Sequence, residues 1–192
     1  MRYALFSLQS DSRSLKANAF DIAVRFIYAK LFWLKKGLLL HSAGIIKDKR
    51  AFLFLGSCGS GKTTIARNSG KYPLLSDEMV GIKQEGEEFY AFSTPWGNEA
   101  RAGRTNTFTA VVKKIFFLHK DKSLWFKNIP SSEAMATALA GNHHIVFFLQ
   151  WAEKDEIAAI ISSLSDLVKC IPVWEMHFTK NVDFWRHLPE RG

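Results

Sequence analysis

The first long apolar pattern in the chain has a helical period. Between residues 19 and 34, apolar side chains return every three or four positions, as in an amphipathic helix. One stripe of this helix carries Phe20, Val24, Ile27, Leu31 and Leu34. Charged residues at positions 21, 25 and 30 make the segment too polar to span a membrane. We therefore expect a helix whose stripe packs on the protein's own core, in preference to one that docks on a membrane surface.

A β pattern replaces the helical one after Gly37. Two apolar runs, residues 38–46 and 51–55, are joined by a short charged connection at 47–50, which predicts two antiparallel strands in a hairpin. The second run leads into a glycine-rich loop, and residues 62–68 suit a helix. The chain is therefore expected to pass from a hairpin through a loop into a helix.

The rest of the chain alternates short apolar runs with helical segments. Strands are predicted at 73–75, 79–83, 89–92, 111–118, 124–126 and 172–178. Helices are predicted at 131–140, 155–168 and 181–188. Residues 95–109 fit neither pattern, and an irregular segment of this length is typical of a functional loop. The predicted fold class is α/β, with a mixed β-sheet flanked by helices.

Length and composition indicate one folding unit. The 192 residues allow a full hydrophobic core. Hydrophobic residues make up 47% of the chain and charged residues 23%, which is ordinary for a soluble globular protein. We expect a single domain over residues 1–192, with an N-terminal helical segment at 1–36 and the catalytic core at 37–192.

Charge and cysteine usage narrow the possible partners. The chain has 26 Lys and Arg against 18 Asp and Glu, a formal net charge of +8, which favours anionic ligands. No RNA-binding signature, zinc-ligand spacing or dense basic tract accompanies this excess, so a nucleotide fits better than nucleic acid. Cys58 and Cys170 are far apart, and a disulfide at Cys58 would distort the glycine-rich loop. We expect a cytoplasmic protein with neither a membrane nor a nucleic-acid partner.

The glycine-rich loop matches the pattern G-x-x-x-x-G-K-[ST] that binds nucleotide phosphates. The predicted nucleotide-binding residues are Gly56, Ser57, Cys58, Gly59, Ser60, Gly61, Lys62, Thr63 and Thr64. In such loops small residues let backbone N–H groups face the phosphates, Lys62 would add positive charge, and Thr63 would offer a hydroxyl to Mg²⁺. The predicted strand before the loop and the helix after it are the context that this motif requires. The alternative is a glycine-rich turn whose lysine is only solvated.

Two adjacent acids, Asp77 and Glu78, follow the predicted strand at 73–75. A kinase needs a group that holds Mg²⁺ and a base for the attacking hydroxyl. Neighbouring acids on extended backbone point to opposite sides, so one can face the metal and the other the substrate. A solvated turn is the alternative. His41, on an apolar run, is by itself typical of a buried core histidine.

Three blocks of sequence together resemble the HPr kinase/phosphorylase-like family, which shares its nucleotide core with phosphoenolpyruvate carboxykinase. The blocks are residues 38–46, 52–64 and 74–78, which read LLLHSAGII, FLFLGSCGSGKTT and LLSDE. The similarity continues through Thr94-Pro95-Trp96 and residues 171–178, and so extends to near the end of the chain.

The resemblance implies both a fold and a chemistry. The fold has a β-hairpin before the phosphate loop, and the reaction uses ATP and Mg²⁺. Asp77 is implied as the base that deprotonates an acceptor serine, with His41 beside it, Lys62 at the transferred phosphate and Glu78 on Mg²⁺. Relatives of this family tend to assemble, so a homo-oligomer is implied as well.

Some positions depart from the family pattern. Two aspartates are usual where this chain has an Asp-Glu pair, and residues 94–99 stand in place of a glutamate and arginine signature. Glu99 is then a candidate further Mg²⁺ ligand, and Arg101 or Arg104 a candidate neutraliser of phosphoryl charge. The segment with which HPr kinases contact HPr is not found here, which leaves HPr open as a substrate. Shortened relatives with the Thr-Pro-Trp form resemble kinase-like proteins of peptide natural-product systems.

The sequence therefore predicts a kinase that uses ATP and Mg²⁺ to phosphorylate a hydroxyl. The acceptor that the resemblance implies is a serine of a peptide or small protein, such as a precursor peptide. Two other classes stay open: a small-molecule kinase or carboxykinase-like enzyme, and a nucleotide-binding regulator without transfer activity.

Overall fold

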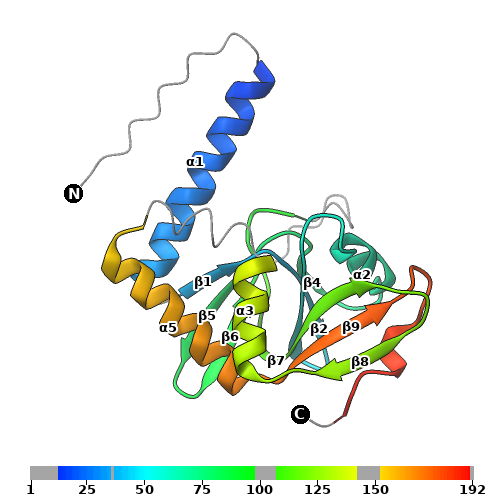
Figure 1. Ribbon diagram of the computed structural model, residues 1–192. Coiled ribbons are helices and arrows are strands. Elements are labelled where there is room, and N and C mark those ends of the chain that lie inside the picture. The colour runs from blue at the N-terminus through cyan, green and yellow to red at the C-terminus, as the bar shows by residue number, and fades with distance from the viewer. Residues whose placement is uncertain (1–12, 36, 98–106, 142–151, 191–192) are drawn as a thin grey trace.

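Residues 13–35, 37–97, 107–141 and 152–190 are described by the computed structural model. Within these residues a curved mixed sheet carries helices on both of its faces (Figure 1). The helices are α1 (Arg13–Leu34), α2 (Lys62–Asn68), α3 (Ser131–Gly141) and α5 (Lys154–Cys170), with one 3₁₀ turn, η2 (Phe184–Arg186). The mixed α/β architecture expected from the sequence is confirmed.

The strands form one sheet in which β7 is the longest. They are β1 (Gly37–Leu40), β2 (Ser42–Lys47), β3 (Arg50–Leu55), β4 (Leu74–Ser76), β5 (Val80–Glu85), β6 (Glu88–Phe92), β7 (Thr109–Lys120), β8 (Trp125–Asn128) and β9 (Val173–Phe178). Their order is β1-β5-β6-β7-β3-β2-β4, and β9 pairs with both β7 and β8. β7 runs parallel to β3 and to β9, and the other pairs are antiparallel. The carboxyl ends of β3, β7 and β9 therefore lie at the same edge of the sheet.

Each face of the sheet has its own hydrophobic cluster. Alternate residues of a strand point to opposite faces, and in β3 this sends Leu53 and Leu55 to one cluster and Phe52 and Phe54 to the other. The first cluster also contains residues of α1, α3 and α5, and the second contains residues of α2 and η2. β3 is buried on both faces, which explains why it reads as a continuous apolar run.

The apolar run at 38–46 is two strands, where the sequence predicted one. β1 pairs with β5, whereas β2 pairs with β3 and β4, and the chain passes from one pairing to the other at His41. β2 and β3 are joined at Lys47 and Arg50 by Asp48 and Lys49, whose φ angles of 51° and 62° are those of a tight two-residue hairpin turn.

The stripe of α1 predicted to pack on the core does not do so, which corrects that expectation. Phe20 and Leu34 are 67% and 74% exposed, and the other three stripe residues are also exposed. The opposite face, with Ala29 and Trp33, is buried. The helix is apolar around much of its circumference, so one stripe in the sequence does not decide which face packs on the core. The face that packs is the one that carries the larger aromatic side chains.

The helix predicted at 181–188 is limited to the single 3₁₀ turn η2, whose Phe184 and Trp185 are buried against α2 and β3. Among the helices that the structure describes, none has the length and apolar character needed to cross a membrane.

Candidate functional site

The glycine-rich loop connects β3 to α2 and depends on three glycines. Gly59 and Gly61 have positive φ angles of 79° and 110°, a conformation that residues with a side chain rarely adopt. A Cβ on Gly61 would lie 2.6 Å from Cζ of Phe178, and one on Gly56 would clash with Oγ of Ser60. The loop is therefore packed between its own residues and the end of β9, and larger side chains at these positions would displace it.

Lys62 is the first residue of α2 and folds back over the loop. Its Nζ donates to the carbonyl oxygens of Gly56 at 2.7 Å and Ser57 at 3.0 Å, and the residue is only 7% exposed. Burial lowers the pKa of Lys62, and the nearby Cys58 and Glu78 oppose that shift. The ammonium group thus lies within the loop, held by neutral carbonyl groups.

Ser76 shapes the turn that carries the two acids. Its Oγ accepts hydrogen bonds from the backbone N–H groups of Glu78 at 3.0 Å and Met79 at 2.9 Å, and donates to the carbonyl of Trp96 at 2.8 Å. The hydroxyl of Thr94 donates to the carbonyl of Met79 at 2.6 Å. The Thr-Pro-Trp segment noted in the sequence therefore packs against the acidic turn and fixes its backbone.

Asp77 and Glu78 have different environments. Asp77 is 4% exposed, and a Cβ on Gly97 would lie 2.7 Å from its Oδ1. Gly97 itself has a φ of 90°, so glycine is required there both for backbone conformation and for contact with Asp77. Glu78 is half-exposed and points toward α1.

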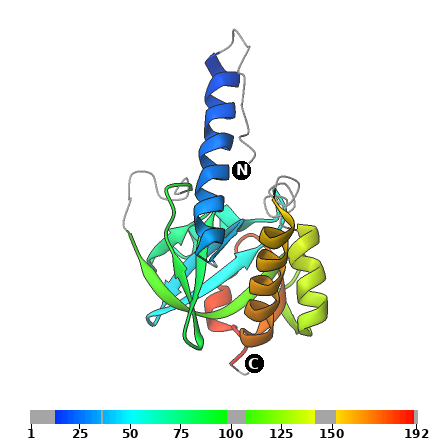
Figure 2. The same ribbon diagram turned by 90° about the vertical axis from the view of Figure 1, so that its left-hand side faces the viewer.

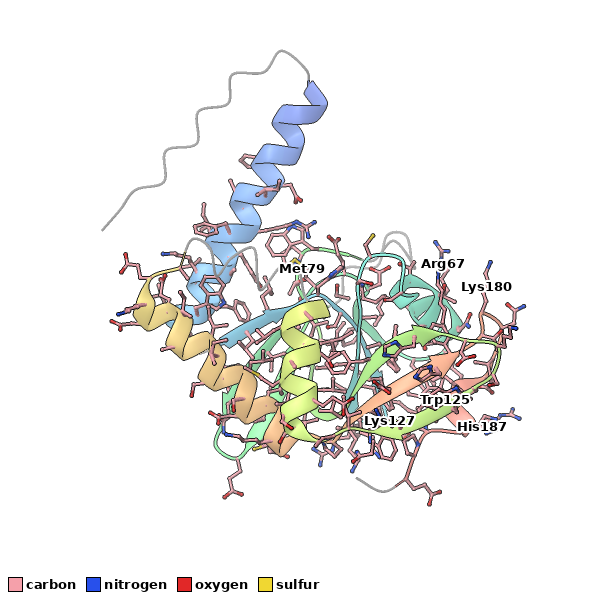
Figure 3. All side chains as sticks on the ribbon, in the orientation of Figure 1. Arg67, Met79, Trp125, Lys127, Lys180 and His187 are labelled. Atoms are coloured by element: carbon pink, nitrogen blue, oxygen red, sulfur yellow. The ribbon has the colours of Figure 1, made fainter. Side chains whose placement is uncertain are left out.

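Arg25 of α1 holds the carboxylate of Glu78, which the sequence did not predict. Arg25 Nη1 lies 2.5 Å from Glu78 Oε1, and its Nε lies 2.6 Å from Asp21 Oδ2. The indole N–H of Trp96 donates to Asp21 at 3.1 Å. Burial by itself would lower the pKa of Arg25. The hydrogen bonds and the attraction to both acids outweigh burial, so the pKa of Arg25 is raised. Met79, labelled in Figure 3, also contacts Arg25 through its sulfur at 3.2 Å.

One cavity of about 410 Å³ brings most of the predicted site residues together. It is lined by His41, Cys58, Gly59, Gly61, Lys62, Thr63, Thr64, Asp77, Glu78 and Lys120. Lys120 was not predicted: it stands at the carboxyl end of β7, and only the pairing of β7 with β3 brings it to the loop. Gly56, Ser57 and Ser60 are not among the lining residues, and the carbonyl oxygens of Gly56 and Ser57 instead hold Lys62.

A second cavity of about 450 Å³ adjoins the first at the end of β9. It shares Gly61, Thr64 and Lys120 with the first cavity and is completed by Asp121, Phe178, Thr179 and Lys180. The carbonyl of Lys180 accepts a hydrogen bond from the side chain of Asn68 at 2.9 Å, and Lys180 lies near Arg67 of α2 in Figure 3. This cavity could hold the part of a nucleotide that extends beyond its phosphates.

The predicted metal ligands are only partly placed. Thr63 and Glu78 line the first cavity, whereas Glu99, Arg101 and Arg104 lie outside the described residues. In the described part of the chain, no three His, Cys, Asp or Glu side chains form a metal-binding group. Magnesium at phosphate sites is held by one or two protein oxygens, substrate phosphates and water. A hydroxyl and a carboxylate beside Lys62 fit that donor set.

The fold and the cavity define a class, namely a mixed α/β protein with a glycine-rich loop and two acids at one edge of its sheet. The family described as SynChlorMet cassette protein ScmC matches residues 8–190, and this chain belongs to that family. Among solved structures, the chain is similar to the Hpr(Ser) kinase/phosphatase from Coxiella burnetii, with 12% identity, a TM-score of 0.40, and coverage of 78% of this chain and 89% of that one. No curated protein matches the sequence.

Proposed function

We propose that this protein is a kinase that transfers the γ-phosphoryl group of ATP to a hydroxyl group. The observation that carries the proposal is the shared cavity, in which Lys62 and Thr63 of the phosphate-loop motif face the same space as Asp77 and His41. Phosphoryl transfer needs positioning and charge neutralisation more than covalent chemistry, and this set of side chains supplies a cation, a hydroxyl and a candidate base.

The loop is the proposed phosphate site. Lys62 Nζ is held by two carbonyl oxygens, and the phosphate oxygens of a bound nucleotide would be stronger acceptors for the same ammonium group. Lys120 adds a second positive charge to the cavity.

Asp77 is the proposed base. In the proposed reaction the acceptor oxygen forms a bond to the γ-phosphorus, the bond from that phosphorus to the bridging oxygen of ADP breaks, and the hydroxyl proton passes to Asp77. The backbone of Asp77 is fixed by the bonds of Ser76, and Gly97 packs against its carboxylate, which supports a defined position for proton transfer. His41 lines the same cavity and is proposed to orient this acid.

Thr63 and Glu78 are the residues that would hold Mg²⁺. The ion, when bound, neutralises charge on the phosphate oxygens. Glu78 could contribute its carboxylate only in competition with Arg25, which makes an ion pair with Oε1.

The proposed acceptor is a serine hydroxyl of a peptide or small protein. Two observations support this proposal. The phosphate-loop and acidic blocks resemble those of serine kinases, and the Thr-Pro-Trp segment, which resembles that of peptide-modifying relatives, packs on the acidic turn. The family is described as a cassette protein, so we propose that the acceptor is a product encoded in the same cassette.

Incubation with γ-labelled ATP, Mg²⁺ and the peptides of that cassette tests the proposal. We expect label on one peptide, with a mass increase of one phosphoryl group on a serine. The Lys62→Met variant is the control that removes the positive charge from the loop. Nucleotide binding without transfer to any peptide, protein or small hydroxyl compound would contradict the kinase assignment.

A nucleotide-binding regulator is the second candidate, and the ion pair between Arg25 and Glu78 favours it. A carboxylate held by a guanidinium group at 2.5 Å is less available to a metal ion than a free one. If the protein is a regulator, it should bind ATP without transfer or hydrolysis. The same labelling experiment therefore separates the regulator from the kinase.

A further inference from the structure

The outward face of α1 has the spacing of a coiled-coil seam. Its exposed apolar residues are separated by four, three, four and three positions, and they are Phe20, Val24, Ile27, Leu31 and Leu34. This is the 3.5-residue period of the a and d positions of a heptad. We call these five residues the α1 seam. Between residues 20 and 34, every position outside the seam except Ile22 is buried or half-buried.

The inward face of α1 already anchors the helix to the rest of the protein. Tyr28 packs edge-on against Trp96 with ring centroids 4.9 Å apart, Arg25 holds Glu78, and Lys30 lies 3.1 Å from Glu156 of α5. Turning the seam onto the core would break these contacts. The seam is therefore available to another molecule while the helix stays attached to its own domain.

The seam is unusual for this protein's surface. Seven large apolar side chains are exposed among the described residues, and six of them lie on α1. Figure 2 shows α1 rising from the body, with its N-terminal half away from the sheet and the other helices. The five seam residues together expose on the order of 600 Å² of apolar surface, which equals the largest patches of ordinary monomers.

We propose that α1 pairs with α1 of a second copy of this chain through the seam. A narrow stripe with only a and d positions is typical of a helix pair, whereas a helix that lies on a membrane carries a broader apolar arc. Two copies of the seam would bury at most roughly 1,200 Å², which is the lower end of the range of specific protein interfaces. Apolar a and d positions such as Val24, Leu31 and Ile27 supply knobs and holes for an identical partner.

Sedimentation of the full-length protein at about 50 µM tests this proposal, because a concentration well above micromolar also populates a pair with a small interface. We expect wild-type protein to sediment as a dimer and Ile27→Asp as a monomer, with the dissociation constant raised at least about 100-fold because the charge is buried in the seam. Ile22→Asp is the matched control: the same change on the same helix, at an exposed position on the far side from the seam. It should leave the dimer intact.

Leu31→Asp is a second seam variant, in case Ile27→Asp lowers the unfolding temperature, and it should also give a monomer. The proposal is overturned if wild-type protein is a monomer, or if seam variants that unfold at the wild-type temperature remain dimers. A monomer that co-sediments with phosphatidylglycerol vesicles would assign the seam to a membrane surface instead. None of these readouts depends on nucleotide or on transfer, so failure of the kinase proposal leaves the result unaffected.

Discussion

At the scale of single residues, Lys62 shows how the loop prepares a positive charge for an anion. The ammonium group is held by two carbonyl groups in a nearly water-free position, and burial lowers its pKa from 10.5. A phosphate group would favour the charged form, so binding of a nucleotide would raise the pKa again. The loop thus links nucleotide affinity to proton binding at one side chain.

This link predicts a pH dependence of ATP binding. As pH rises through the lowered pKa of Lys62, the free protein loses the charge and ATP affinity falls, which calorimetry between pH 7 and about pH 10 can measure. Lys62→Met should bind ATP about 10- to 100-fold more weakly at neutral pH, because a charge-assisted hydrogen bond is worth about 1.5–3 kcal/mol. Its remaining affinity should not follow this titration. Equal pH dependence in the two proteins would contradict the role of Lys62.

In the ligand-free protein, the same pKa shift makes the contribution of Lys62 to stability depend on pH. Between the lowered pKa and 10.5 the unfolded chain binds the proton more readily than the folded one, so the contribution of Lys62 to the unfolding free energy grows as pH rises through that range. At lower pH, burial of the charged group is a cost to the fold, and it remains present throughout the neutral range.

Gly97 yields a second prediction at this scale. Gly97→Ala places a methyl group 2.6 Å from Ser76 Oγ and 2.7 Å from Asp77 Oδ1, at a φ of 90°. We expect a loss of about 1–2 kcal/mol from backbone strain and a further loss from the displaced acidic turn, measured by denaturant unfolding. Gly86→Ala is the control, because Gly86 has a φ of 62° but nothing within 4 Å of the added Cβ. Equal destabilisation of the two variants would show that Gly97 does not support Asp77.

At the scale of elements, α1 is connected to the acidic turn by Arg25, which holds Glu78, and by Asp21 and Tyr28, which contact Trp96. Arg25 joins the helix to Glu78 and stands over the ring of Trp96 at 5.3 Å from its centroid. The positive charge of Arg25 therefore acts on the carboxylate that would hold Mg²⁺, although no part of α1 lines the cavity.

Removal of this charge should make Mg²⁺ more effective. In Arg25→Met, Glu78 loses its competing cation, and we expect half-maximal transfer at a Mg²⁺ concentration about fivefold lower, corresponding to about 1 kcal/mol for a partly exposed ion pair. Arg25→Lys keeps the charge and is expected to stay near the wild-type requirement. A higher Mg²⁺ requirement in Arg25→Met would mean that Arg25 positions Glu78 for the metal.

The elements also show what the sequence could and could not predict. The strand, loop and helix from Arg50 to Asn68 were predictable because glycine spacing and apolar runs are local signals. The packing face of α1 was not, because Phe26, Trp33 and the seam residues are all apolar, and the choice between faces is made by the aromatic contacts with Trp96 and the core. His41 was assigned to one strand, and only the different partners of β1 and β2 divide that run.

At the scale of the whole molecule, sheet order decides which distant residues meet. The parallel pairs of β7 with β3 and β9 bring Lys120 and Phe178 to the phosphate loop. No local pattern specifies these pairings, so the sequence identified the loop and the acidic pair but missed Lys120 and the second cavity. Arg25 escaped prediction for a similar reason, since its partner lies 53 residues away in the chain.

One cavity unites the phosphate loop with Asp77, and single-turnover phosphoryl transfer by Asp77→Asn tests most directly whether Asp77 acts there as the base. Asparagine preserves the size of the side chain but cannot accept the proton of the acceptor hydroxyl. We predict that the variant binds ATP with an affinity within about twofold of wild type and transfers the phosphoryl group at least about 100-fold more slowly, the usual contribution of a general base. Transfer at the wild-type rate by Asp77→Asn would contradict the role of Asp77 as the base.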